Sequence, residues 1–186
     1  MFFWIFLGVV VLLLLYAVGV YNRLVRLRAL VHEAFSGITV QLRRRADLIP
    51  NLVSTVQGYA THERETLDAV VAHRGDAMNA GGVAATAQAD NAMTAMLGRL
   101  FAVAEAYPEL KADANFRDLQ DDLSALESEL QSARRYYNAT ARDLNTRIFS
   151  FPDMLFATPM GFKEEPYYED ADASIQTAPK VEFQRP

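Results

Sequence analysis

The first twenty residues of the chain contain no charged side chain, and the first charge is Arg23. At about 1.5 Å of rise per residue they would form a helix roughly 30 Å long, which matches the hydrocarbon thickness of a bilayer. A cleaved signal peptide would need a basic start, a shorter apolar run and a small-residue cleavage site, and none of these is convincing here. We therefore predict a permanent transmembrane anchor over residues 1–21, with the lipid bilayer as partner. Aromatic side chains, which favour the membrane interface, stand near both ends of the stretch: Phe2, Phe3, Trp4, Tyr16 and Tyr21.

The charges that follow the anchor predict its orientation. Arg23, Arg26 and Arg28 flank it on one side, whereas the other side offers only the α-amino group. Because arginines next to a span tend to stay in the cytoplasm, we expect the N-terminus outside and the rest of the chain inside. The alternative is that these arginines only solvate a helix face. The chain has no cysteine, which is compatible with either compartment.

The net charge of −5 is unevenly distributed. Residues 21–45 contain six arginines and one acid, Glu33, which sum to +5, so residues 46–186 carry −10. Anionic headgroups would attract the basic segment. The acidic remainder argues against nucleic acid as a partner, because binding to phosphates usually needs a net basic surface.

Beyond the anchor the apolar residues follow a helical spacing. Similar patterns mark helices over residues 24–45, after Pro50 and before Pro108, and the "NAGG" stretch at 79–82 predicts a break. The last long segment is the clearest, because its steps of three and four residues continue until Pro152. Its apolar positions are Phe116, Leu119, Leu123, Leu126, Leu130, Ala133, Tyr137, Ala141, Leu144, Ile148 and Phe151.

Four amphipathic helices without a strand pattern predict an all-α protein: a transmembrane helix followed by an antiparallel up-and-down four-helix bundle. We expect the bundle over residues 22–160, with a loop region at 107–115. Residues 161–186 are rich in acids and prolines, which predicts an acidic tail that is partly disordered or laid on the bundle surface.

The stretch "QLRRRADLIPNLV", residues 41–53, predicts a corner between two helices. Arg43 to Arg45 would lie at a helix C-terminus, where cations are favourable. Asp47 would cap the next helix, and Pro50 would fall in its first turn, where no backbone donor is needed.

A search for catalytic, cofactor or metal sites finds none. His32-Glu33 and His62-Glu63 lack the second histidine that a zinc motif would place four residues on, and His73 is the only other histidine. Ser36-Gly37 lacks the strand and tight turn of a nucleophile elbow, and Gly81-Gly82 lacks the remainder of a phosphate-binding loop. We predict a protein that is not an enzyme and has no cofactor. A metal-binding or signalling module with a site in the bundle core is the alternative.

Tyr137 and two glycines of the anchor are best interpreted as packing residues. Tyr137, within "RRYYN", lies on the apolar seam, which favours a buried ring with a partner for its hydroxyl. Gly8 and Gly19 fall on one face of the anchor, where small residues could let two anchors approach closely. Together with the opposite charges of the two segments, this face leads us to expect a homo-oligomer, besides an unknown protein partner.

Five pieces of sequence follow one another in order between residues 21 and 157: "YNRLVRLRALVHEAF" from Tyr21, "VQLRRRADLIPNLVSTVQGYATHE" from Val40, "AEAYPELKADANFRDLQDDL" from Ala104, "ESELQSARRYYNATARDLNTRI" from Glu127 and "FPDMLFA" from Phe151. They resemble motifs of the LemA family of bacterial membrane proteins. The resemblance implies a helical bundle at the cytoplasmic face of the bacterial inner membrane, on one N-terminal anchor, and implies no enzyme activity. One related branch is associated with magnetosome membranes, so we expect a non-catalytic scaffold or self-assembling organiser. Thr39 and Ala46 depart from the family pattern.

Overall fold

The computed structural model describes residues 1–60 and 62–169, and helices are the only regular elements within them. The predicted all-α class is therefore confirmed. The helices are α1 (Phe2–Gln57), α2 (Arg64–Asn79), α3 (Val83–Ala104), α4 (Pro108–Ala112), α5 (Ala114–Phe149) and α6 (Met154–Ala157). The acidic sequence beyond residue 169, which holds most of the predicted tail, lies outside the described residues.

Helix α1 continues without interruption from the apolar N-terminal stretch to Gln57. Its 56 residues correspond to about 84 Å, and its first part is long and apolar enough to cross a membrane. The predicted corner between two helices at residues 41–53 is therefore wrong, because all of these residues lie within α1. Asp47 is exposed in mid-helix and caps nothing, and Pro50 lies inside the helix.

An arginine from another helix explains how α1 tolerates Pro50. A proline inside a helix donates no hydrogen bond to the carbonyl four residues before it, here that of Ala46. The Nε of Arg74, on α2, donates to this Ala46 oxygen at 2.7 Å. The carbonyl that Pro50 leaves without its helical partner is thus satisfied from α2, and the helix continues.

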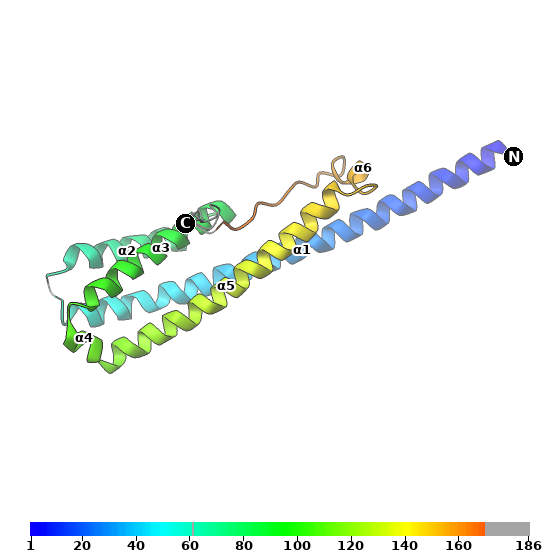
Figure 1. Cartoon of the computed structure of the whole chain (residues 1–186). Helices are drawn as coiled ribbons and strands as arrows, with labels where there is room; N and C mark the ends of the chain where they lie inside the picture. Colours follow the sequence, from blue (N-terminus) through cyan, green and yellow to red (C-terminus); the bar gives the residue numbers. More distant parts are fainter. Residues whose placement is uncertain (61, 170–186) are drawn as a thin grey trace, which may run out of the picture.

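The other long helices pack beside α1 (Figure 1). Helix α5 runs back along α1, and α2 and α3 form a hairpin beside the part of α1 that is far from the N-terminus. The hairpin turns at the predicted "NAGG" break, where Gly82 has a φ of +79°. Such a φ favours glycine, which has no Cβ to clash.

Two predicted boundaries are corrected. The helix predicted to follow Pro50 and include Leu67 is split, since α1 ends at Gln57 and α2 begins at Arg64. The predicted loop at 107–115 contains the short α4, and Asp113 caps α5 by accepting a hydrogen bond from the Phe116 N–H at 2.9 Å. That bond, followed by one from the Tyr59 hydroxyl, lowers the pKa of Asp113.

The buried apolar residues form two clusters along the α1–α5 pair. The proximal core, nearer the anchor, comprises Val20, Leu24, Val31, Ala34, Ile38, Leu42, Ala87, Leu130, Tyr137, Ala141, Leu144, Ile148, Ala157, Phe162 and Tyr168. The distal core comprises Ile49, Leu52, Val56, Ala60, Leu67, Val70, Met93, Met96, Leu97, Leu100, Ala104, Leu110, Phe116 and Leu123. Most positions of the predicted seam of α5 supply the two cores, but Leu126 is only partly buried and belongs to neither, and Phe151, beyond the end of α5, is largely exposed.

Candidate functional site

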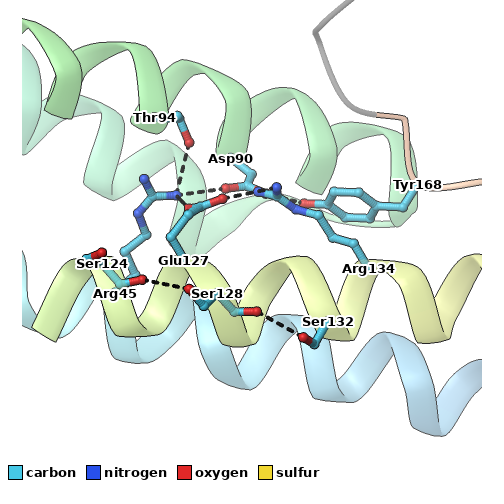
Figure 2. Close-up of polar contacts among 9 residues, drawn as sticks. All are labelled: Arg45, Asp90, Thr94, Ser124, Glu127, Ser128, Ser132, Arg134 and Tyr168. Carbon is cyan, nitrogen blue, oxygen red and sulfur yellow. Dashed lines mark hydrogen bonds and ion pairs between the residues drawn. The ribbon is translucent and has the colours of Figure 1, made fainter. Parts of the chain in front are cut away.

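Charged side chains from α1, α3 and α5 gather in one cluster (Figure 2). It lies where the proximal core meets the distal core, and its members Arg45, Asp90 and Arg134 are buried. On α1, Arg45 falls between the last proximal residue, Leu42, and the first distal one, Ile49. On α3, Asp90 falls between Ala87 and Met93 in the same way. Helix α5 contributes Glu127 and Arg134, and we call these four residues the ion cluster.

Asp90 is the centre of the ion cluster, and its side chain is 0% exposed. Its Oδ1 accepts a hydrogen bond from Arg45 Nη1 at 3.1 Å, and its Oδ2 accepts one from Arg134 Nη2. The Tyr168 hydroxyl donates to the same Oδ2 at 2.8 Å. One carboxylate thus joins α1, α3, α5 and the segment that follows α6.

Glu127 balances the charge of the cluster. Its Oε2 lies 3.2 Å from Arg45 Nη1, and its Oε1 accepts a hydrogen bond from Arg134 Nη1 at 3.3 Å. Arg45 Nη1 also donates to Thr94 Oγ1 at 3.0 Å. Two guanidinium groups therefore face two carboxylates, which compensates the cost of removing each charge from water.

The electrostatics of the cluster favour one fixed protonation state. Burial acts to lower the pKa of Arg134, but the charge and hydrogen bond of Asp90, with the charge of Glu127, raise it. Burial and then the negative charge of Asp90 raise the pKa of Tyr168, so its phenol keeps the proton that it donates. The cluster is therefore better suited to holding the helices together than to acid–base chemistry.

The segment 163–169, which we call the strap, follows α6 in extended form and lies along α5. Asn145 pairs with the backbone of Glu165, donating at 2.8 Å and accepting at 2.9 Å. Asn138 pairs in the same way with the backbone of Tyr168, at 3.1 and 2.8 Å. This part of the predicted tail is therefore laid on the helices.

The spacing of the two asparagines matches the geometry of the strap. Asn138 and Asn145 are seven residues apart on a helix, which is about 10 Å. Glu165 and Tyr168 are three residues apart in extended chain, which is also about 10 Å. Between them, the Tyr137 hydroxyl donates to the Pro166 carbonyl at 2.7 Å. The predicted buried ring with a hydroxyl partner is confirmed, and burial, with the charge of Glu165, raises the pKa of Tyr137 to about 12.

The histidines considered for a metal site are not brought together. His32 is exposed on α1, His62 lies before α2, and His73 is on α2 with its Nδ1 3.6 Å from Asp76. Across residues 1–60 and 62–169, no group of three or more His, Cys, Asp or Glu side chains is placed to hold a metal ion. The carboxylates of the ion cluster are already engaged by arginines.

Sequence reasoning missed the ion cluster and the strap, although a signal was present. Arg45, Asp90 and Arg134 each occupy a position at apolar spacing, where the neighbours three or four residues away are core residues. A charge at such a position needs a partner from another element. The sequence alone instead suggests that Arg45 lies at a helix C-terminus, where cations are favourable, and it suggests no role for Asp90.

Comparison with known proteins places the chain in a family. The LemA family profile matches residues 34–183. The chain is 25% identical to magnetosome protein MamQ 2 of Paramagnetospirillum magneticum over 179 residues, covering 82% of this chain and 66% of that protein. It is 27% identical to protein LemA of Metamycoplasma hominis over 135 residues, covering 72% of this chain and 62% of the relative. The chain thus spans somewhat under two thirds of the length of these relatives, and it belongs to the LemA family.

Proposed function

We propose that this protein is a non-catalytic, membrane-anchored scaffold that self-assembles at the cytoplasmic face of the bacterial inner membrane. In this proposal the helices beyond the anchor act as an antiparallel up-and-down four-helix bundle. The observation that carries it is the continuity of α1, which joins the apolar span and the bundle in one helix. A continuous helix transmits position and orientation, whereas a flexible linker would not.

The ion cluster supports a rigid role. It ties α1, α3, α5 and the strap to a single buried carboxylate, Asp90, in the middle of the molecule. Removing one partner of a buried pair is costly, so the helices are held in one register. Such a body can present its far end at a fixed height of about 50 Å above the anchor, the length of the 35 residues between Arg23 and Gln57.

Self-assembly is supported by the open glycine face of the anchor. A Cβ added at Gly8 or at Gly19 would meet no atom within 4 Å, so this face is free within one chain to receive another. Anchoring to one membrane face also raises the effective concentration, so weak contacts suffice. Relatives named as magnetosome proteins agree with an organising role at a membrane.

Sedimentation of the full-length protein in mild detergent tests the proposal. We expect an oligomer at about 0.1 M salt that weakens at about 0.5 M, where the Debye length falls below about 5 Å. An oligomer that resists salt but is lost in Gly8→Leu and Gly19→Leu assigns the contact to the anchor. Gly37→Leu, at an exposed glycine of α1 beyond the anchor, is the matched control. A monomer at both salt concentrations would refute self-assembly.

The orientation needs its own measurement. A fusion of alkaline phosphatase to the C-terminus should be inactive in intact cells, because that enzyme requires the oxidising periplasm. Activity in intact cells would place the bundle outside and contradict the proposed cytoplasmic location.

A further inference from the structure

The end of α5, the turn that follows it and α6 expose large apolar side chains next to the anchor. Phe149 is 62% exposed, Phe151 78% and Leu155 59%. A soluble surface rarely exposes several such side chains within seven residues of the chain, and exposed apolar surface of this kind marks an interaction site. We call these three residues the apolar tip.

No exposed charge interrupts the apolar tip. Residues 148–162 contain a single ionisable side chain, Asp153, which is only 1% exposed. Asp153 forms an ion pair with Arg147 and accepts a hydrogen bond from the Tyr16 hydroxyl at 2.6 Å. The charge is therefore neutralised inside the turn, and the surface that the turn presents is apolar.

The contacts of this turn fix its height along the anchor. Tyr16, which bonds to Asp153, also packs its ring against Phe156 with 5.7 Å between centroids. Farther along α1, the ring of Tyr21 packs against Phe162 at 5.8 Å. Tyr16 lies seven residues before the first charge, Arg23, or about 10 Å within the apolar span.

A turn held beside Tyr16 cannot stay in water when the span crosses the bilayer. If the membrane surface lies at the level of Arg23, the turn enters the leaflet to a depth typical of interfacial elements, about 5–10 Å. The pairing of Asp153 with Arg147 is what a charge at that depth requires. Burial of the apolar tip in lipid also removes its exposed surface from water.

We propose that the apolar tip is a second membrane contact, in which Phe149, Phe151 and Leu155 insert among the lipid acyl chains beside the anchor. This inference rests on the proposed membrane anchor. With two points of attachment, the anchor and the tip, the bilayer fixes the tilt and rotation of the helices and not only their position. The occupant is lipid, because the tip is continuous with the span through the Tyr16 contacts.

Spin-label accessibility in vesicles tests this insertion. The chain has no cysteine, so single-cysteine variants can be labelled without altering other sites. The variants are Phe151→Cys and Leu155→Cys in the tip and Leu13→Cys, 54% exposed, within the span. Tyr136→Cys, 51% exposed on α5 and far from the span, is the aqueous control. The full-length protein is reconstituted in phosphatidylcholine–phosphatidylglycerol vesicles, and collisions with oxygen and with a water-soluble nickel chelate are measured.

The expected result is that both tip labels behave like the label at position 13, with frequent oxygen collisions and few nickel collisions. Tip labels that match position 136 overturn the inference while leaving the anchor intact. Tip labels shielded from both reagents indicate a protein partner at the tip and also overturn it. If the label at position 13 itself is accessible to nickel, the proposed anchor fails, so the two failures are distinguishable.

Discussion

The two halves of the molecule build similar apolar cores from different partners. In the distal half, α1 and α5 are covered by the α2–α3 hairpin and by α4, so helices pack on helices. In the proximal half, the hairpin contributes Ala87 of α3, and α6 and the strap supply further cover, with Phe162 and Tyr168 buried in the core. The distal half relies on ridges of side chains between helices, whereas the proximal half also relies on hydrogen bonds from side chains to an extended backbone.

This difference shows that the same helix pair, α1 and α5, can be covered by other helices in one half and by an extended segment in the other. An extended chain has backbone donors and acceptors that must be satisfied when it is buried. Asn138 and Asn145 satisfy them from α5. The two positions match because seven residues of helix and three residues of extended chain both span about 10 Å. The ion cluster stands where one kind of cover replaces the other, and Asp90 contacts both, through Arg45 and through Tyr168.

The largest effect is expected from Asp90→Ala, which removes the common acceptor at the boundary of the two halves. Two buried arginines and a phenol would lose a partner, so the free energy of unfolding should fall by about 3–5 kcal/mol. Chemical denaturation in detergent, followed by circular dichroism, measures it. Asp122→Ala, at an exposed position of α5, is the control and should change stability by less than about 0.5 kcal/mol. Equal effects of the two variants would show that the cluster does not hold the halves together.

The next prediction concerns the distal half. Pro50→Ala restores the helical hydrogen bond to Ala46, so it should stabilise the protein by about 1–2 kcal/mol. Arg74→Ala should destabilise the protein, and by less in the Pro50→Ala background, because the Ala46 carbonyl then has another donor. Additive effects in this double-mutant cycle would contradict the role assigned to Arg74. Asp47→Ala should leave the free energy of unfolding unchanged, because Asp47 is exposed in mid-helix and does not act as the predicted cap.

An effect of similar size but opposite sign is expected in the proximal half. Asn138→Ala and Asn145→Ala should each cost about 1–2 kcal/mol, because each leaves backbone groups of the strap without a partner. Hydrogen exchange should show faster exchange at the Tyr168 and Glu165 amides and little change in the distal helices. Gln131→Ala, also on α5 but exposed, serves as control. If exchange rose equally in both halves, the strap would not be a separate cover of the proximal core.

The smallest effect concerns pH. Burial and Glu165 raise the pKa of Tyr137 from about 10 to about 12, so the folded state retains this proton where the unfolded state loses it. The stabilisation is complete below pH 10 and is lost as the pH rises towards 12. Tyr137→Phe, which cannot ionise, should flatten this part of the stability profile. An unchanged slope between pH 10 and pH 12 would show that Tyr137 does not contribute to it.

The sequence predicted those features that depend on local spacing. The all-α class, the apolar span, the break at 79–82 and the seam of α5 all follow from residues close together in the chain. The features that it missed depend on distant residues. Pro50 alone predicts a corner, because the sequence does not reveal that Arg74 donates a hydrogen bond to the Ala46 carbonyl. In the same way, the sequence does not reveal that Asp90 accepts a hydrogen bond from Tyr168, 78 residues away.

The central claim, that one continuous helix joins the anchor to the distal half, can be tested by a single distance. Spin labels at Asn22→Cys and Gln57→Cys, both exposed on α1, would lie 35 residues apart along the helix and about 100° apart around its axis. Double electron–electron resonance on the reconstituted full-length protein should give one narrow distribution near 52 Å. A corner at residues 46–50 with the following helix folded back would place the labels near 26 Å. A distance near the shorter value, or a broad distribution between the two, would contradict the continuous helix and with it the proposed rigid scaffold.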